Sequence, residues 1–178
     1  MEKPNSKKEQ RIYCKNARSR LDEKTRSLYS HQICEKLLPY LTDKNILSYY
    51  PYKDEADISE INNRFPVSLP VTYDDLSMEA IRPAEDRYRI NKLNIKEPDP
   101  DYGTIINKND LDVIIVPLLG FDEKRNRLGH GKGYYDRFLK DLKALKIGVA
   151  FEAQKLDAVC IDEHDIPLDL IITEKEVY

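Results

Sequence analysis

The sequence lacks the features that mark membrane-spanning, secreted and nucleic-acid-binding proteins. No apolar run approaches the roughly 20 residues that a bilayer-spanning helix needs, so we expect no membrane partner. The first residues, MEKPNSKKEQR, contain no apolar segment typical of a secretory signal, and their acidic residues are atypical of transit peptides. We therefore expect a cytoplasmic location. A net charge of −3 and a pI near 5.7 argue against a general nucleic-acid binder, and no obligate protein partner is evident.

Cysteine is also scarce. The three cysteines, Cys14, Cys34 and Cys160, are odd in number and widely spaced, which favours reduced thiols over a disulfide framework. No Cys/His spacing resembles a zinc site. Internal repeats and low-complexity tracts are absent from the sequence. A chain of 178 residues, 40% hydrophobic and 34% charged, is long enough for one globular domain over residues 1–178 but not for two independent domains.

The most informative stretch covers residues 113–139. It begins with the β-branched run Val113 to Val116, which is typical of a strand buried on both faces, and Pro117 is expected to end that strand. A polar segment then leads into the glycine-rich loop 129–133. The apolar spacing over residues 134–146 predicts a helix after the loop.

A glycine-rich loop between a strand and a helix suits an anion such as phosphate. Glycines let the backbone approach a ligand closely, and the first turn of a helix offers unpaired N–H groups. Arg127 and Lys132 add positive charge there. The loop is not a P-loop, because Gly133 follows Lys132, and its G-x-G-x-G spacing is not the dinucleotide fingerprint, which disfavours an NAD(P)-dependent oxidoreductase. From spacing alone, a flexible turn remains the alternative.

The rest of the chain alternates helical and strand-like segments. Two helices are expected within residues 6–41, with Asp22 capping the second, and a short helical segment is expected from Asp57 to Arg64. Strands are expected at residues 45–50, 66–73, 78–81, 147–151 and 170–173, and a connecting loop at 97–109. This order predicts an α/β domain with a mainly parallel (mixed), Rossmann-like open sheet flanked by helices. The turn after the first strand, the glycine loop and the C-terminal tail should then share a pocket.

The string R-L-G-x-G-x-G-Y-Y-D-R at residues 127–137, behind V-P-L-L-G-F-D at 116–122, closely resembles the signature of the 5-formyltetrahydrofolate cyclo-ligase (methenyltetrahydrofolate synthetase) family. The resemblance extends from Lys7 to Thr173 and is densest in this block. It implies an ATP- and Mg²⁺-dependent enzyme that converts 5-formyltetrahydrofolate, with or without a polyglutamate tail, to 5,10-methenyltetrahydrofolate. The implied reaction phosphorylates the formyl oxygen, closes the ring through N10, and releases ADP and phosphate.

The resemblance also implies a set of site residues. Arg127 and Lys132 would act in catalysis, and Asp136 and Asp165 would hold Mg²⁺, which needs only one or two carboxylates besides ATP oxygens. The residues implied to bind ATP are Lys7, Arg11, Arg127, Leu128, Gly129, His130, Gly131, Lys132, Gly133, Tyr134 and Tyr135. The residues implied to bind the folate are Tyr52, Asp57, His130, Gly131, Lys132, Gly133 and Tyr134.

Several of these positions have a plain alternative. Lys7 and Arg11 match a family Lys-x-x-x-Arg but equally suit a solvated basic helix face. Asp57 suits a helix N-cap, and neighbouring Glu55 is the other acid that could meet the folate. Tyr135 shares a helical register with core residues. Asp136 suits the start of a helix through its charge, and Asp165 suits a turn.

Two positions depart from the family pattern. His130 stands where some members have arginine, so His130→Arg is expected to tighten ATP binding. Asn94, in the segment L-N-I-K-E-P at residues 93–98, stands where glycine is more usual and suits a positive φ.

A non-catalytic nucleotide- or folate-binding protein is the alternative function. It would not need the charged residues beyond the loop: Lys7, Arg11, Asp57, Asp136 and Asp165.

Overall fold

The computed structural model describes residues 4–85, 87–92 and 94–178. Leu93, part of the L-N-I-K-E-P segment, and residues 1–3 of the N-terminal stretch lie outside the described residues. Within the described part of the chain, none of the helices combines the length and the apolar character that crossing a membrane requires.

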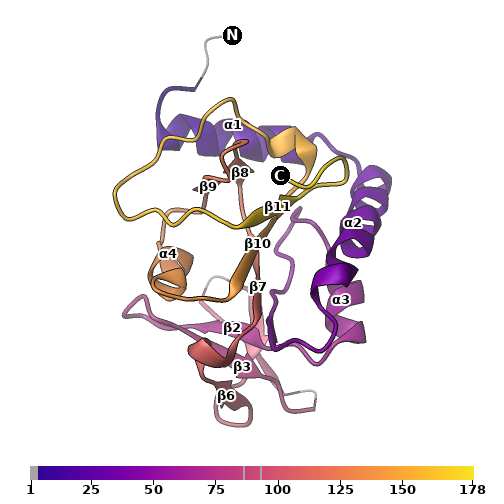
Figure 1. The fold of residues 1–178 in the computed structure, drawn as a ribbon, viewed down its shortest axis with the longest axis vertical. Helices are drawn as coiled ribbons and strands as arrows, with labels where there is room; N and C mark the ends of the chain where they lie inside the picture. The colour runs from indigo at the N-terminus through magenta and orange to yellow at the C-terminus, as the bar shows by residue number, and fades with distance from the viewer. Residues whose placement is uncertain (1–3, 86, 93) are drawn as a thin grey trace.

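A four-stranded parallel sheet forms the centre of the fold, which confirms the predicted α/β class (Figure 1). Its strands, in spatial order, are β1 (Ile46–Leu47), β7 (Val113–Pro117), β10 (Leu145–Val149) and β11 (Leu170–Ile172). β7 is an inner strand and ends at Pro117, as the sequence predicts.

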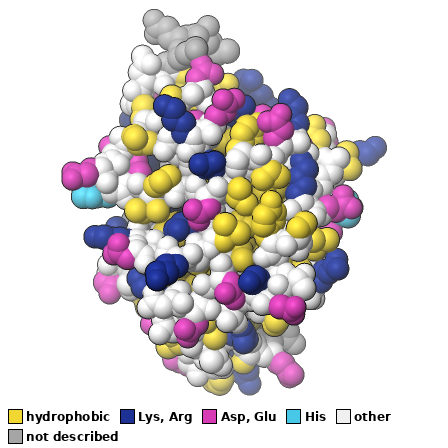
Figure 2. Space-filling view, viewed as in Figure 1, with side chains coloured by type: hydrophobic (Ala, Val, Ile, Leu, Met, Phe, Trp, Pro, Cys, Tyr) yellow, Lys and Arg dark blue, Asp and Glu magenta, His cyan; other side chains and the backbone are white. Residues whose placement is uncertain are grey.

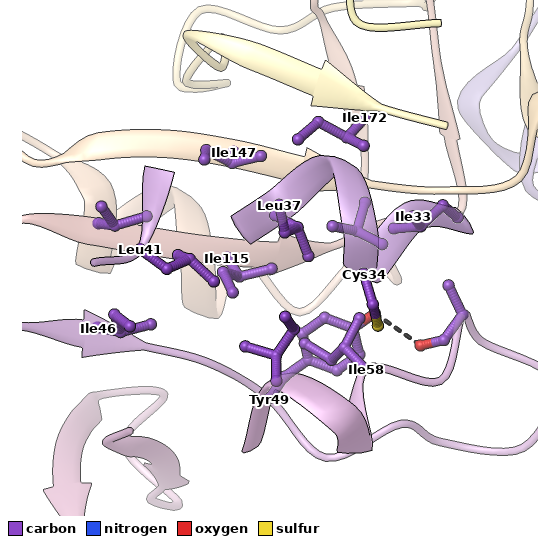
Figure 3. Close-up of a cluster of buried hydrophobic side chains, with 14 of the residues drawn as sticks. Ile33, Cys34, Leu37, Leu41, Ile46, Tyr49, Ile58, Ile115, Ile147 and Ile172 are labelled. Atoms are coloured by element: carbon purple, nitrogen blue, oxygen red, sulfur yellow. Dashed lines mark hydrogen bonds between the residues drawn. The ribbon is translucent and has the colours of Figure 1, made fainter. Parts of the chain in front are cut away.

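Alternate side chains of β7 enter two different hydrophobic clusters, because successive residues of a strand point to opposite faces. Val113 and Ile115 pack with α2 in one cluster, shown in Figure 3. Ile114 and Val116 pack in the other cluster with the helix that follows the glycine loop. The sheet is therefore covered on both faces, as the β-branched run indicates.

Four α-helices surround the parallel sheet: α1 (Lys7–Ser19), α2 (Glu23–Leu37), α3 (Ser59–Arg64) and α4 (Tyr134–Leu139). In Figure 1, α2 and α3 lie on one side of the sheet and α4 on the other, while α1 lies beyond the carboxyl end of β7. The predicted N-cap of α2 is confirmed, because the Asp22 carboxylate accepts a hydrogen bond from the Thr25 N–H at 2.8 Å. Short 3₁₀ helices follow at η1 (Leu38–Tyr40), η2 (Lys108–Asp110) and η3 (Glu152–Gln154).

The helix after the glycine loop is shorter than its apolar spacing predicts. The predicted helix begins at Tyr134 as expected, but its predicted extent to residue 146 is wrong, since α4 ends at Leu139 and Asp141 has a left-handed φ of 61°. Leu142 is buried in the turn and Leu145 already begins β10, so both satisfy an apolar pattern without continuing the helix. A helix this short adds little dipole to the loop.

Short antiparallel strands complete the fold; the strands predicted at 66–73 and 78–81 are confirmed as β2 (Leu69–Thr72) and β3 (Met78–Arg82), and the others were not predicted from the sequence. β2, β3 and β6 (Thr104–Ile106) form one sheet, β4 (Tyr88–Ile90) pairs with β5 (Lys96–Pro98), and β8 (Gly120–Phe121) pairs with β9 (Arg127–Leu128). The expectation that residues 97–109 form only a loop is therefore wrong for the end of β5 and for β6. β2 lies at the edge of its sheet, as Pro70 indicates.

The three cysteines are free. Burial raises the pKa of the Cys14 and Cys34 thiols to about 12, while Cys160 is partly exposed.

On the face where α2 and β11 lie, hydrophobic side chains gather at the surface and charged side chains surround them (Figure 2).

Candidate active site

A cavity of about 370 Å³ lies where the carboxyl ends of β1 and β7 meet α1 and the β4–β5 hairpin. The turn after the first strand, the glycine loop and the tail residue Asp165 all line it, so these segments share a pocket as the sequence predicts. The predicted site residues that line the cavity are Lys7, Arg11, Tyr52, Arg127, Leu128, Gly129, His130, Gly131, Lys132, Gly133, Tyr134, Tyr135, Asp136 and Asp165. Asp57 is the one described residue that was predicted to act here but does not line the cavity.

The glycine loop has a conformation that only glycine adopts without strain at two positions. Gly131 has φ 98° and Gly133 has φ 70°. Arg11, from α1, donates a hydrogen bond from Nε to the Gly129 carbonyl at 2.9 Å. A Cβ at Gly131 would lie 3.2 Å from Arg11 Cζ, so the loop and this guanidinium are closely packed. The predicted basic face of the first helix is therefore turned to the loop.

The β8–β9 hairpin places Arg127 at the wall of the cavity. Its turn is held by buried Asp122, whose carboxylate accepts hydrogen bonds from the N–H groups of Lys124 at 3.0 Å and Asn126 at 3.1 Å. Arg127 is only 7% exposed, and its Nη2 donates to Asp136 Oδ1 at 2.5 Å.

Both predicted metal carboxylates already have cationic partners. Asp136 pairs with Arg127, and Asp165 accepts a hydrogen bond from Lys7 Nζ at 2.5 Å. Partial burial raises the pKa of Asp165, but the hydrogen bonds from Lys7 and from the Asp162 N–H outweigh it and leave this pKa below its usual value. Burial lowers the pKa of Lys7, yet its bonds to Asp162 and Asp165 raise it overall.

The described residues contain no group of three or more His, Cys, Asp or Glu that could hold a metal ion by itself. Any Mg²⁺ here would need ATP oxygens in addition to one or two carboxylates, and magnesium commonly binds in this way. Because Asp136 and Asp165 offer the hard oxygen atoms that Mg²⁺ prefers, the residues are compatible with a metal–nucleotide complex.

Lys132 differs from Lys7 and Arg127, the two cations of the cavity that pair with carboxylates. Its side chain is exposed and pairs with no carboxylate among the residues that the structure describes. Its backbone carbonyl accepts a hydrogen bond from Arg137 Nη2 at 2.7 Å, which steadies this part of the loop. The loop therefore holds the backbone of Lys132 while its ammonium group stays available.

Opposite the glycine loop, Glu55 presents its carboxylate to the cavity. The side chain is 7% exposed; Oε2 accepts a hydrogen bond from the Tyr52 N–H at 3.0 Å, and Oε1 lies 3.1 Å from His130 Nε2. Asp57 is exposed, and its carboxylate accepts from the Ser59 N–H at 2.9 Å at the start of α3. Of the two acids that the sequence left open, the structure brings Glu55 to the cavity. The expectation that Asp57 caps the helix is wrong, because the N-cap of α3 is Ile58 without a side-chain cap, and Asp57 only accepts from Ser59 in the turn before it.

The paired tyrosines line the cavity with different hydroxyl environments. Tyr134 donates to the Tyr73 carbonyl at 3.3 Å. Burial raises the pKa of Tyr135 far above its ordinary value, and its buried hydroxyl has no partner among the described residues. The Arg127 guanidinium lies 5.7 Å from the centre of the Tyr135 ring.

Among the lining residues that were not predicted as site residues are two charged ones, Lys96 and Glu97. Glu97, in β5, is 2% exposed and accepts hydrogen bonds from Arg89 Nη2 at 2.8 Å and Asn91 Nδ2 at 3.0 Å. Lys96 Nζ lies 4.1 Å from the centre of the Tyr88 ring. The only sequence signal was the L-N-I-K-E-P segment, in which Asn94 has the predicted positive φ, here 59°.

Comparison with known proteins identifies the family of this chain. A sequence model described as the 5-formyltetrahydrofolate cyclo-ligase family matches residues 3–174. The 5-formyltetrahydrofolate cyclo-ligase of Mycoplasma genitalium is 34% identical over 161 residues, which cover 87% of this chain and 90% of that protein. The enzyme of the same name from Mycoplasma pneumoniae is 33% identical, with 84% of this chain and 87% of that protein covered.

A solved structure gives the same answer for the fold. The 5,10-methenyltetrahydrofolate synthetase of Aquifex aeolicus is 33% identical and superposes with a TM-score of 0.83 over 96% of this chain and 91% of that one. The resemblance drawn from the glycine loop and its neighbours is thus confirmed: the chain belongs to the 5-formyltetrahydrofolate cyclo-ligase family, whose members are ATP-dependent.

Proposed function

We propose that this protein converts 5-formyltetrahydrofolate to 5,10-methenyltetrahydrofolate, with ATP as co-substrate and with release of ADP and phosphate. The observation that carries the proposal is the single cavity in which the glycine loop faces Glu55 and a wall of aromatic residues. A phosphoryl donor on the loop and a folate on the opposite wall could meet there. Family membership supports the same reaction.

The reaction asks this chain mainly for positioning and charge. The γ-phosphoryl group moves to the formyl oxygen on N5, N10 then attacks the activated carbon, and phosphate leaves as the ring closes. Such a transfer needs orientation and electrostatic stabilisation more than a protein nucleophile. Arg127 is already oriented by Asp136, and Lys132 can follow the phosphoryl group because its ammonium is not committed to a carboxylate among the described residues.

The folate would bind against Glu55, Tyr52 and Tyr134. A buried carboxylate can accept hydrogen bonds from the N–H groups of a pterin, and Glu55 has its Oε1 turned toward His130 in the cavity. We therefore propose Glu55 instead of Asp57 for this contact. Lys7, Arg11 and the loop amides of 129–133 are proposed to hold the ATP phosphates.

Mg²⁺ is proposed to bind together with ATP. Five Lys or Arg side chains and four Asp or Glu side chains line the cavity, so the side chains leave only a small positive excess against a triphosphate. A divalent cation bound to the phosphates and to Asp136 or Asp165 would supply the missing charge. The carboxylate oxygens of Asp136 and Asp165 are ligands that Mg²⁺ prefers, which supports the proposal.

Further proposals rest on the sequence and on the family alone. They are that the substrate binds with or without a polyglutamate tail, that the protein works in the cytoplasm, and that residues 1–178 form one domain. A partner protein, a nucleic acid and a membrane are not part of the proposed function.

Absorbance at the methenyl-folate band, followed after mixing protein, 5-formyltetrahydrofolate, ATP and Mg²⁺, tests the function directly. We expect a signal that requires both ATP and Mg²⁺ and that falls sharply in Asp136→Ala. The matched control is Asp74→Ala, which removes an exposed carboxylate that pairs with exposed Lys92 and lies outside this cavity lining. A protein that binds ATP and folate but yields no signal would instead be a non-catalytic binder.

A further inference from the structure

Arg18 is a buried cation that the proposed mechanism does not yet use. It lies on α1 and is 4% exposed, and its Nη2 donates to Asp54 Oδ1 at 2.7 Å. Its Nε and Nη1 atoms are buried and have no hydrogen-bond partner among the described residues. A buried N–H without a hydrogen-bond partner is destabilising, so packing of the helix gives a poor account of an arginine at this position.

The nearest negative charge besides Asp54 belongs to Glu55. Arg18 Nη1 lies 4.0 Å from Glu55 Oε1, while His130 approaches the same oxygen and the Tyr52 N–H holds Oε2. Glu55 therefore has the Tyr52 N–H, His130 and Arg18 around it, and only Arg18, which lies beyond hydrogen-bond distance, is permanently charged.

We propose that Arg18 is a positioning residue for the folate, acting through Glu55. The inference rests on the proposed function, in which Glu55 accepts hydrogen bonds from the pterin. Burying a carboxylate is unfavourable unless a nearby charge compensates for the lost hydration. Arg18 supplies that charge from behind the cavity wall, with its Nη1 4.0 Å from Oε1, and so favours the position in which the carboxylate stays close to it. Because Arg18 lies behind the wall, the substrate can approach Glu55 from the open side of the cavity.

Arg18 could instead simply tie α1 to the turn at residues 52–55 through Asp54. Asp54→Asn separates the two roles, because it weakens the tie and keeps both Arg18 and Glu55. If Arg18 only tied α1 to this turn, Asp54→Asn and Arg18→Met would weaken folate binding equally. A positioning role predicts that Arg18→Met is the more damaging to folate binding and that Asp54→Asn changes it little.

A double-mutant cycle between Arg18→Met and Glu55→Gln tests the proposal, because coupled residues deviate from additivity. Calorimetry gives Kd for 5-formyltetrahydrofolate and, separately, for ATP. We expect Arg18→Met to weaken folate binding about tenfold, equal to about 1.4 kcal/mol, while Kd for ATP changes less than twofold. In the Glu55→Gln background the same substitution should weaken folate binding less than twofold. Arg18→Lys should restore part of the loss.

The outcomes of this cycle are distinct. Additive effects of the two substitutions, or equal losses for ATP and folate, overturn the positioning role. If Arg18→Met does not fold, then Asp54→Asn and Arg18→Lys decide: a folate loss in Asp54→Asn as large as that in Arg18→Lys overturns the proposal. Wild-type turnover is measured in parallel, so a protein that binds folate without turnover refutes the proposed reaction and leaves the cycle valid.

Discussion

Replacing Arg127 by methionine should lower kcat/KM by about 100- to 1000-fold, or about 2.7–4 kcal/mol of transition-state stabilisation. This is the usual loss when one oriented donor to a developing charge is removed. The structure supports the upper part of the range. Arg127 is 7% exposed and oriented at 2.5 Å by Asp136, so no exposed side chain or water can readily replace it.

The same substitution should also reduce the free energy of unfolding, because Asp136 loses its partner. Breaking a fully buried pair costs about 3–5 kcal/mol, but the Asp136 side chain is 22% exposed and can be partly hydrated. We therefore expect a loss nearer 1–2 kcal/mol, at the low end for a charge left without its hydrogen bond.

Two further variants separate activity from stability. The double variant Arg127→Met/Asp136→Asn should recover most of the lost stability, since no unpaired charge remains, and should stay inactive. Arg127→Lys keeps the charge but not the planar fork, so it should be intermediate in activity. Urea unfolding and the methenyl absorbance assay measure the two effects. A kcat/KM within fivefold of wild type in Arg127→Met would refute the role given to this guanidinium.

Three other outcomes are expected. Gly131→Ala should weaken ATP binding about tenfold, measured by calorimetry, because φ 98° is strained for alanine and its Cβ would press on Arg11; unchanged affinity would contradict the loop geometry. Asp165→Asn should lower the unfolding free energy at neutral pH. Since pairing with Lys7 lowers the folded-state pKa of Asp165, its contribution is present above the unfolded value of about 3.9 and disappears as pH falls through the lower folded value; a difference that does not shrink as pH falls below that unfolded value would refute this. Alkylation near pH 7 followed by mass spectrometry should label Cys160 well before the two buried thiols, whose pKa burial raises to about 12, and equal labelling would contradict their burial.

Features with a local physical cause could be predicted from the sequence. Asp22 caps its helix because a short acidic side chain reaches the free N–H groups there. Pro117 ends its strand because it lacks an N–H, and Asn94 takes a positive φ because its side chain tolerates it. These causes act within a few residues, so they can be recognised without knowing the partner segments.

Features that depend on distant partners could not be predicted. β6 and the β8–β9 pair are only two or three residues long and exist because another segment offers hydrogen bonds. Leu142 and Leu145 fit a helical period although one lies in a turn and the other in a strand. Periodicity reports burial, and burial alone does not specify the backbone conformation.

The choice between Asp57 and Glu55 shows the same limit at the site. Both acids follow the first strand, and only the path of the turn decides which carboxylate faces the cavity. His130 is a similar case. An arginine there would also meet Glu55, because the imidazole lies 3.1 Å from that carboxylate. The expected gain in ATP affinity for His130→Arg thus stays a prediction, and competition from Glu55 opposes it.

The arrangement of charges explains how a protein of net charge −3 can offer a site for two anionic substrates. Lys7 and Arg127 are held by carboxylates, which fix the cations before any phosphate arrives and reduce the side-chain entropy, up to about 2 kcal/mol each, that binding would otherwise remove. Such cations orient a ligand, but the carboxylates beside them reduce the positive potential that the ligand meets. Lys132 keeps its charge and its mobility. A moving phosphoryl group needs both kinds of cation, because fixed ones define where the transfer begins and a mobile one can follow it to the formyl oxygen.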